Sequence, residues 1–175
     1  MTPRAKEILR AARKLLESEG PDALSMRNLA ERLGIKAPSL YKHFPSKEAL
    51  EAGLISQGFE ETATLFEAAL EKSREPIVAM ARAYRTYAHR HPHLYRLMHD
   101  RSLNRPLLTP GSEERAAAPI IAATGGDQDL ARALWAFAHG MTILELNDRF
   151  PRDADLDAAW DRGLAALRAS VPLNR

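Results

Sequence analysis

Apolar residues recur three or four positions apart along almost the whole chain, the spacing of one face of an α-helix. Thr2 and Pro3 form a helix start. Gly20 is expected to end the first helix as a left-handed cap, Gly34 ends the second, and Pro45 ends a short third one. The expected helices run over about residues 2–20, 25–34, 37–44, 46–72, 76–90, 92–101, 112–125 and 127–148, with a last one capped by Asp153. Because no alternating strand pattern and no internal repeat is present, the sequence predicts an all-α protein.

The second and third expected helices, with the tight turn at Gly34 between them, form a helix-turn-helix pattern. In that motif the first helix braces against the DNA backbone and the second enters the major groove. The apolar residues expected to fix the angle between the helices are Leu29, Ala30, Leu33, Ile35, Leu40 and Phe44. Because Leu40 and Phe44 take the buried face, the three residues between them are expected to point outward with their donors exposed.

Charge is distributed unevenly along the chain. Residues 1–47 hold ten Lys or Arg against five Asp or Glu, whereas the remainder holds fifteen against eighteen. This asymmetry favours a basic N-terminal portion that faces a polyanion. From charge alone, an unevenly charged solvated surface is an equal alternative.

Composition excludes several classes of protein. The chain of 175 residues is 45% hydrophobic and 27% charged, values typical of a globular protein with a buried core. It has no cysteine, so disulfides and thiolate chemistry are excluded. It has neither an apolar run of membrane-spanning length nor an apolar signal core. The expectation is a cytoplasmic protein without a membrane partner or a cofactor.

The segment "SMRNLAERLGIKAPSLYKHFPSKEAL", residues 25–50, carries the most specific signal. In this order and spacing it resembles the N-terminal domain of the tetracycline-repressor (TetR) family of bacterial transcription regulators. The resemblance extends over about residues 3–62 and implies a three-helix DNA-binding domain there, followed by a helical effector-binding and dimerisation domain over 63–175. It also implies double-stranded operator DNA as the partner and repression as the activity.

The resemblance assigns DNA contacts residue by residue. The implied contact residues are Arg27, Lys36, Ala37, Ser39, Tyr41, Lys42, His43 and Lys47. Ala37 and Ser39, at the start of the recognition helix, are implied to approach base edges, and the others phosphates. Lys36 departs from the family pattern, which more often has a capping Ser or Thr there. Lysine cannot accept that bond, a loss of about 1 kcal/mol that Pro38 partly offsets, so Lys36 is expected to trade cap stability for a phosphate contact.

The second half of the chain resembles a subclass of the family's ligand-binding domains. The segments "ALWAFAHGM" (Trp135, His139 and Gly140) and "HPHLYRLM" carry this likeness. An effector is expected between the helices of 76–101 and 112–148, with the loop 102–111 as its entry gate. The candidate effector residues are Tyr84, Tyr87, Tyr95, Met98, His99, Trp135, His139 and Met141, though periodicity does not decide which face inward. An aromatic and sulfur-containing lining favours an uncharged, largely hydrophobic ligand.

The last two helices are expected to form the interface of a homodimer. The helix over 127–148 is apolar nearly all round, more than one chain's core needs. The stripe of Leu156, Trp160, Leu164 and Leu167 adds a second apolar surface, and Gly163 is expected to allow close approach. Two-fold symmetry would suit a pseudo-palindromic operator.

Two other functions remain open. His89, His91, His93 and His99 lie close in sequence, and a metal-dependent hydrolase would use such a cluster. Helix-end histidines at the surface are the simpler interpretation, because Pro92 breaks the segment and Asp100 is the only nearby carboxylate. No phosphate loop and no nucleophile–base arrangement is recognisable, so neither catalysis nor a metal is expected. The second alternative is a DNA-binding module without a ligand.

Overall fold

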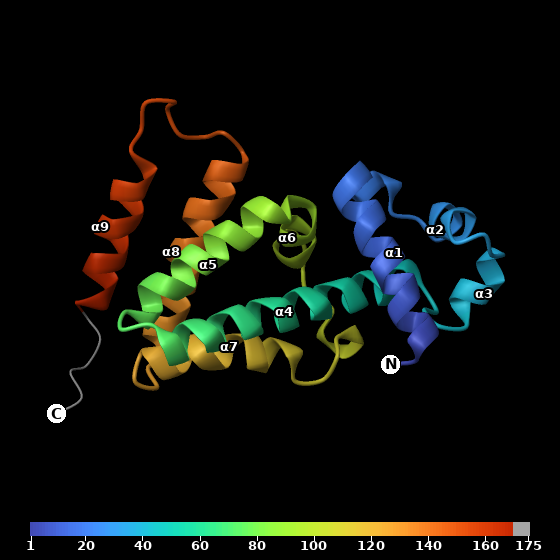
Figure 1. Cartoon of the computed structure of the whole chain (residues 1–175), viewed down its shortest axis with the longest axis horizontal. Coiled ribbons are helices and arrows are strands. Elements are labelled where there is room, and N and C mark those ends of the chain that lie inside the picture. The colour runs from blue at the N-terminus through green and yellow to red at the C-terminus, as the bar shows by residue number, and fades with distance from the viewer. Residues whose placement is uncertain (170–175) are drawn as a thin grey trace. The chain divides into compact units, whose positions relative to one another are not determined.

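The computed structural model describes residues 1–169, and every regular element in that range is helical, as predicted (Figure 1). The elements are α1 (Pro3–Glu19), η1 (Pro21–Ala23), α2 (Met26–Arg32), α3 (Ala37–Tyr41), α4 (Lys47–Lys72), α5 (Pro76–Arg90), α6 (Pro92–His99), η2 (Arg105–Leu107), α7 (Ser112–Ala123), α8 (Gln128–Leu146) and α9 (Leu156–Arg168). They form two compact units. The first contains Met1–Glu60 and His91–Glu113, and the second contains Glu61–Arg90 and the chain from Glu114 onward.

Helix α1 forms the core of the first unit. Its buried face consists of Ala5, Ile8, Leu9, Ala12, Leu15 and Leu16. The Thr2 hydroxyl accepts a hydrogen bond from the Ala5 N–H (3.2 Å), and Gly20 follows the helix with a φ of 82°, so both predicted ends of α1 are confirmed. Helices α2 and α6 pack against α1.

The turn between α2 and α3 is a complete Schellman motif. Gly34 has a φ of 63°, in the left-handed region that favours glycine. The Ile35 N–H donates to the Ala30 carbonyl (3.0 Å), and the Gly34 N–H donates to the Glu31 carbonyl (3.1 Å). These bonds satisfy the last carbonyls of α2 and turn the chain at once toward α3. Helix α3 is shorter than predicted, because it ends at Tyr41 rather than Phe44.

Residues 91–113 pack onto α4 within the first unit, an association that the sequence pattern did not predict. A Cβ at Gly58 of α4 would lie 2.4 Å from the Met98 Sδ, so the glycine lets α6 approach closely. The buried Ser56 hydroxyl accepts a hydrogen bond from the Thr109 N–H (2.9 Å). Glu17 of α1 accepts one from the Leu94 N–H (3.2 Å) near the start of α6. Three separate polar and steric contacts therefore hold this segment on the N-terminal unit.

The second unit is a bundle in which α8 packs against α5 and α9. Asp127 caps α8 as predicted, accepting hydrogen bonds from the Asp129 and Leu130 N–H groups at 3.0 and 2.9 Å. The predicted cap of the last helix is wrong: Asp155, not Asp153, accepts the Ala158 N–H (2.9 Å). An N-cap carboxylate accepts from the N–H two or three residues ahead, and Asp153 lies two residues before the position that caps this helix.

The middle of the apolar stripe of α9 faces its own chain rather than outward. Trp160 and Leu164 are 4% and 3% exposed. A Cβ at Gly163 would lie 2.2 Å from Cζ of Phe137 on α8, so the glycine makes room for a ring of the same protomer. The expectation that Trp160, Leu164 and Gly163 add a surface for a second copy is therefore wrong, because they pack within their own chain, whereas Leu156 and Leu167 of the same stripe are partly exposed.

Candidate nucleic-acid interface

The predicted DNA-contacting residues gather around α3 and the ends of α2 and α4. Leu40 is fully buried and anchors α3, whereas the next residue, Tyr41, is 49% exposed. Lys36, Ser39 and Lys42 are exposed as well. Ala37, His43 and Lys47 are partly exposed, and Arg27 is exposed near the start of α2. The local structure therefore leaves one face of α3 free of core contacts.

The cations of this surface fall into two groups. The Arg27 guanidinium lies 3.0 Å from the Glu31 carboxylate, and the Lys47 ammonium lies 3.5 Å from that of Glu51. Lys36 and Lys42 have no carboxylate partner among residues 1–169. An unpaired ammonium can bind a phosphate without first breaking an ion pair with a carboxylate. Lys36 and Lys42 are therefore stronger candidates for phosphate contacts than Arg27 and Lys47.

The start of α3 has no side-chain cap. Lys36 occupies the N-cap position and no side chain accepts a hydrogen bond there, as its side-chain chemistry predicts. Pro38, in the first turn, removes one donor that would need a partner. The next helix start is capped normally, with the Ser46 hydroxyl accepting the Ala49 N–H (3.2 Å). Hydrogen bonding from Ser46 lowers the pKa of Glu48 beside it.

The predicted effector residues are divided between the two units. Tyr95, Met98 and His99 belong to the first unit, and Tyr84, Tyr87, Trp135, His139 and Met141 to the second. The three tyrosines and Met98 are buried, whereas Trp135 is 50% exposed. The Tyr95 and His99 rings lie 4.7 Å apart between centroids, and those of Trp135 and His139 6.3 Å apart. As an effector site the set stays a prediction.

The four clustered histidines do not converge. His89 contacts Glu145 at 3.0 Å, whereas His91 lies 3.9 Å from Glu17 in the other unit. The His93 ring lies against Gly20 instead. Among residues 1–169, no group of three His, Asp or Glu side chains is placed to hold a metal ion.

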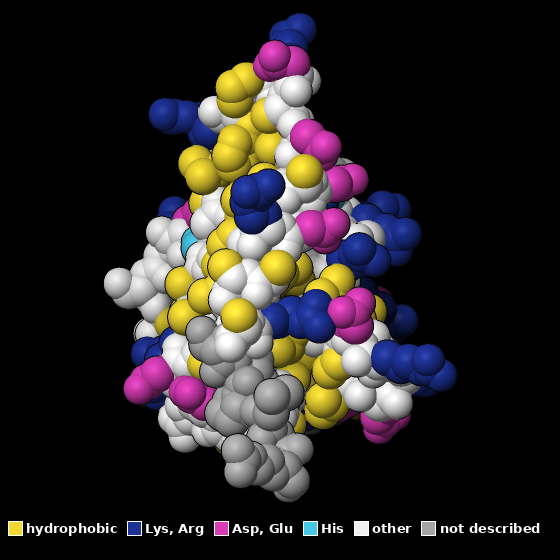
Figure 2. Space-filling view, turned by 90° about the vertical axis from the view of Figure 1, so that its left-hand side faces the viewer, with side chains coloured by type: hydrophobic (Ala, Val, Ile, Leu, Met, Phe, Trp, Pro, Cys, Tyr) yellow, Lys and Arg dark blue, Asp and Glu magenta, His cyan; other side chains and the backbone are white. Residues whose placement is uncertain are grey.

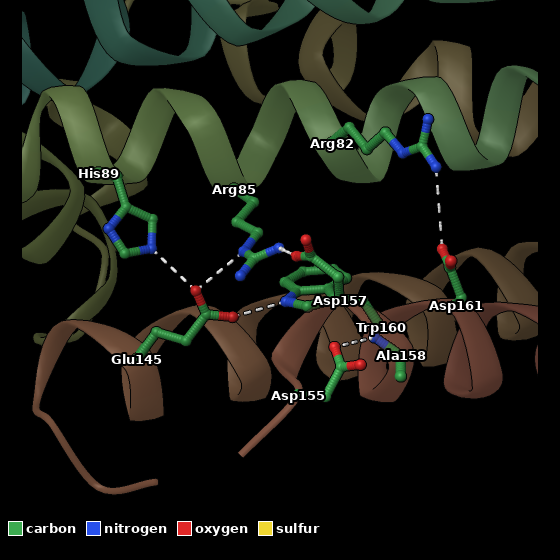
Figure 3. Close-up of polar contacts among 9 residues, drawn as sticks. All are labelled: Arg82, Arg85, His89, Glu145, Asp155, Asp157, Ala158, Trp160 and Asp161. Atoms are coloured by element: carbon green, nitrogen blue, oxygen red, sulfur yellow. Dashed lines mark hydrogen bonds and ion pairs between the residues drawn. The ribbon is translucent and has the colours of Figure 1, made fainter. Parts of the chain in front are cut away.

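A buried carboxylate that sequence reasoning did not single out joins three helices of the second unit (Figure 3). Glu145 of α8, with a side chain only 4% exposed, accepts hydrogen bonds from Arg85 (2.8 Å), His89 (3.0 Å) and Trp160 (2.6 Å). The Arg85 guanidinium also reaches Asp157 of α9 at 2.5 Å and lies 5.6 Å from the Trp160 ring centroid. The signal in the sequence was a single acidic residue within the largely apolar residues 141–146.

The protonation of Glu145 depends on two opposing effects. Burial is the largest single influence and raises its pKa, but the hydrogen bonds from Trp160, Arg85 and His89 together lower the pKa below the ordinary 4.5. Glu145 and Asp157 in turn raise the pKa of Arg85 against the effect of burial. The carboxylate is therefore ionised and paired at neutral pH, and it fixes α9 on α5 and α8.

Comparisons with known proteins agree with this architecture. Residues 8–54 match the sequence model of bacterial regulatory proteins of the tetR family, and residues 77–167 match that of the tetracyclin repressor-like C-terminal domain. The uncharacterized HTH-type transcriptional regulator Rv0681 of Mycobacterium tuberculosis is 32% identical over 177 residues, covering 95% of this chain and 80% of its own length. The class A tetracycline repressor from transposon 1721 of Escherichia coli is 54% identical over 43 residues, 25% of this chain and 20% of that protein.

A solved structure shows the same fold over nearly the full length. The Streptomyces coelicolor protein ActR, in complex with (S)-DNPA, superposes with a TM-score of 0.70 at 23% identity over 98% of each chain. A helix-turn-helix surface joined to a helical bundle defines a DNA-binding transcription regulator. The chain belongs to the TetR family. Within residues 1–169, no helix is long and apolar enough to span a membrane.

The paired state of Glu145 gives a pH-dependent prediction. Glu145→Gln should lower the free energy of unfolding at pH 7 by roughly 1–3 kcal/mol, because Arg85 loses its buried anion. A carboxylate with a depressed folded-state pKa stabilises above its unfolded pKa, and this contribution disappears as pH falls through the folded value. The difference between wild type and variant should therefore shrink below about pH 4.5. Urea unfolding at fixed protein concentration measures the free energy of unfolding of both proteins at each pH. The control is Glu114→Gln, which replaces an exposed carboxylate. A difference independent of pH would contradict this role.

Proposed function

We propose that the protein is a non-enzymatic, homodimeric repressor in the cytoplasm, released from its operator by a small, largely hydrophobic effector. The observation that carries the DNA-binding part is the free face of α3. The buried Leu40 anchors α3 to the core, whereas Tyr41, Lys36 and Lys42 are exposed at the surface. Neither lysine has a carboxylate partner among residues 1–169. Ala37 and Ser39, small residues at the start of α3, suit close approach to base edges, with specificity from the bases and affinity from the phosphates.

Dimerisation is proposed through the outward faces of α8 and α9. The exposed or partly exposed residues on these faces are Ala133, Ala136, Gly140 and Leu144 of α8, and Ala158, Ala165 and Ala169 of or directly after α9. A Cβ at Gly140 would meet nothing within 4 Å, in contrast to Gly163. Figure 2 looks onto the α9 side and shows hydrophobic side chains in a band across it. Small apolar side chains on two neighbouring helices suit close helix packing against a second copy.

An effector site in the helical bundle is proposed on the chemistry of its residues. ActR carries (S)-DNPA in its crystal structure, and the multidrug binding protein EbrR carries imidazole. In this chain, Trp135 and His139 lie one turn apart on α8 and offer an aromatic face with a polar edge. Release of DNA requires that the effector bind better to the conformer whose recognition helices are wrongly spaced.

Substitution of Lys42, which directly follows α3, tests the DNA-binding mode. Lys42→Ala should weaken binding to all duplex sequences to a similar degree. It should also reduce the magnitude of the slope of log affinity against log salt concentration by roughly 0.9 for each phosphate that is no longer neutralised. Lys47→Ala should weaken binding less, because Lys47 already has Glu51 as a partner. Fluorescence anisotropy with a labelled mixed-sequence 30-bp duplex over a salt series measures both. The assignment of Lys42 as a phosphate contact would be contradicted if Lys47→Ala weakened DNA binding more than Lys42→Ala, or if Lys42→Ala left the salt slope unchanged.

The proposed dimer face gives a prediction in solution. Wild-type protein should sediment as a dimer at micromolar concentration, whereas Ala136→Glu should sediment as a monomer because a desolvated charge faces its symmetry mate. Ala118→Glu on α7 is the matched control, exposed and helical but outside the proposed face, and should remain a dimer. A monomeric wild type, or a dimeric Ala136→Glu variant, would rule out this interface.

The effector proposal is tested by filling the site. The screen measures thermal shifts with a set of compounds that includes (S)-DNPA and imidazole. A compound that binds the folded protein and is present at 100 times its Kd adds about 2.7 kcal/mol to the free energy of unfolding and should raise Tm by roughly 5–10 °C. His139→Trp should abolish the shift by occupying the volume, whereas Arg132→Trp, exposed on the same helix, should retain it. The same compound should weaken DNA binding by wild type. An equal shift in both variants would place the ligand elsewhere.

A further inference from the structure

The outward face of α1 carries a row of cations that the helix-turn-helix surface does not use. Lys6, Arg10 and Lys14 are all exposed and follow one another at four-residue intervals, about 6 Å apart along the helix axis. They lie opposite the face that α1 buries in the core of the first unit. The three charges therefore form a basic stripe, defined by these residues, about 12 Å long.

The carboxylates of α1 do not neutralise the basic stripe, because each has another partner. Glu7 pairs with Arg4 at 2.5 Å, and Glu19 pairs with Arg32 of α2. Glu17 lies 3.3 Å from Arg13 and accepts the backbone N–H at the start of α6. Within residues 1–169, no carboxylate pairs with any of the three stripe cations. Their charge is available to an external anion.

The distribution of unpaired cations points to one kind of partner. Residues 1–60 contain ten Lys or Arg, of which Arg4, Arg13, Arg27, Arg32 and Lys47 have carboxylate partners. Of the other five, two flank α3 and three form the basic stripe. A linear row of positive charge in the same compact unit as the groove-reading helix matches the regular negative charge of a DNA backbone.

We propose that the basic stripe is a second DNA contact, which holds the sugar–phosphate backbone outside the groove that α3 enters. This inference rests on the DNA-binding mode proposed above. The stripe has no apolar or aromatic residue of its own and reads no base edges, so it supplies affinity and orientation without sequence preference. Its contribution adds to that of the lysines beside α3.

The first test compares four variants on a mixed-sequence 40-bp duplex. Lys6→Gln/Arg10→Gln/Lys14→Gln should reduce the magnitude of the salt slope by about 2.7 per protomer, so that the drop in affinity between 50 and 200 mM salt shrinks roughly 40-fold. Lys36→Gln/Lys42→Gln should reduce it by about 1.8. The control Lys72→Gln/Arg74→Gln/Arg152→Gln removes three exposed charges from the second unit and should leave the slope unchanged. The exchange Lys6→Arg/Arg10→Lys/Lys14→Arg keeps the charge and should retain wild-type binding.

The second test detects the contact itself. Because the chain has no cysteine, Arg10→Cys provides a unique thiol for a maleimide photocrosslinker. Irradiation with the 40-bp duplex should yield a covalent DNA adduct from this position and none from Arg152→Cys in the second unit. This readout separates contact from a change in net charge.

The outcomes separate the two proposals. If the stripe variant behaves like the second-unit control and Arg10→Cys gives no adduct, the stripe proposal is overturned, while loss of binding in Lys36→Gln/Lys42→Gln still supports the α3 surface. If the stripe variant has a shallower slope but the α3 variant does not, the stripe proposal stands and the α3 lysines are misassigned. If neither variant has a shallower slope, both proposals fail.

Discussion

A left-handed residue at Gly34 lets the chain leave α2 and begin α3 three residues later. The two backbone hydrogen bonds of this turn use the last carbonyls of α2, so the turn leaves little freedom in the angle between the helices. Any other residue at this position would hold a strained φ, although a Cβ there would meet no atom within 4 Å. The constraint is one of backbone conformation rather than of space, and the placement of the proposed DNA-contacting face of α3 depends on it.

Helix α3 is too short to be stable alone. It has five residues and no side-chain cap, and an isolated helix of this length does not form in water. Its stability comes from tertiary contacts through Leu40 and, just beyond its end, Phe44, which are 0% and 7% exposed. Because these two buried side chains supply the packing on one face, the opposite face of α3 makes no core contacts. This division explains how the chain can place Tyr41 at the end of α3, and Lys36 and Lys42 on either side of the helix, without disturbing the core.

The sequence predicted those features of the fold and of the candidate site that depend on chemistry within a few residues. The caps at Thr2 and Asp127 are local in this sense, and the exposure of Tyr41 follows from the apolar residues on either side. Features that depend on distant partners were missed. The attachment of residues 91–113 to the N-terminal unit and the Glu145 network both join segments far apart, and helical periodicity does not name a neighbour. The stripe of α9 was misjudged because its pattern does not reveal whether its own chain or another covers it.

The path of the chain limits how the proposed effector response could reach the first unit. The chain passes between the units three times, at residues 60–61, 90–91 and 113–114. The first and third passages lie inside α4 and the first turn of α7, whereas the second lies at the non-helical His91, with φ −132° and ψ 55°. A continuous helix can transmit a displacement along its axis more directly than a non-helical junction. For the effector response proposed above, a full switch from 1:99 to 99:1 needs about 5.5 kcal/mol of differential binding. Helix α4, which runs through the passage at residues 60–61, is the helical passage nearest to α3 in the chain.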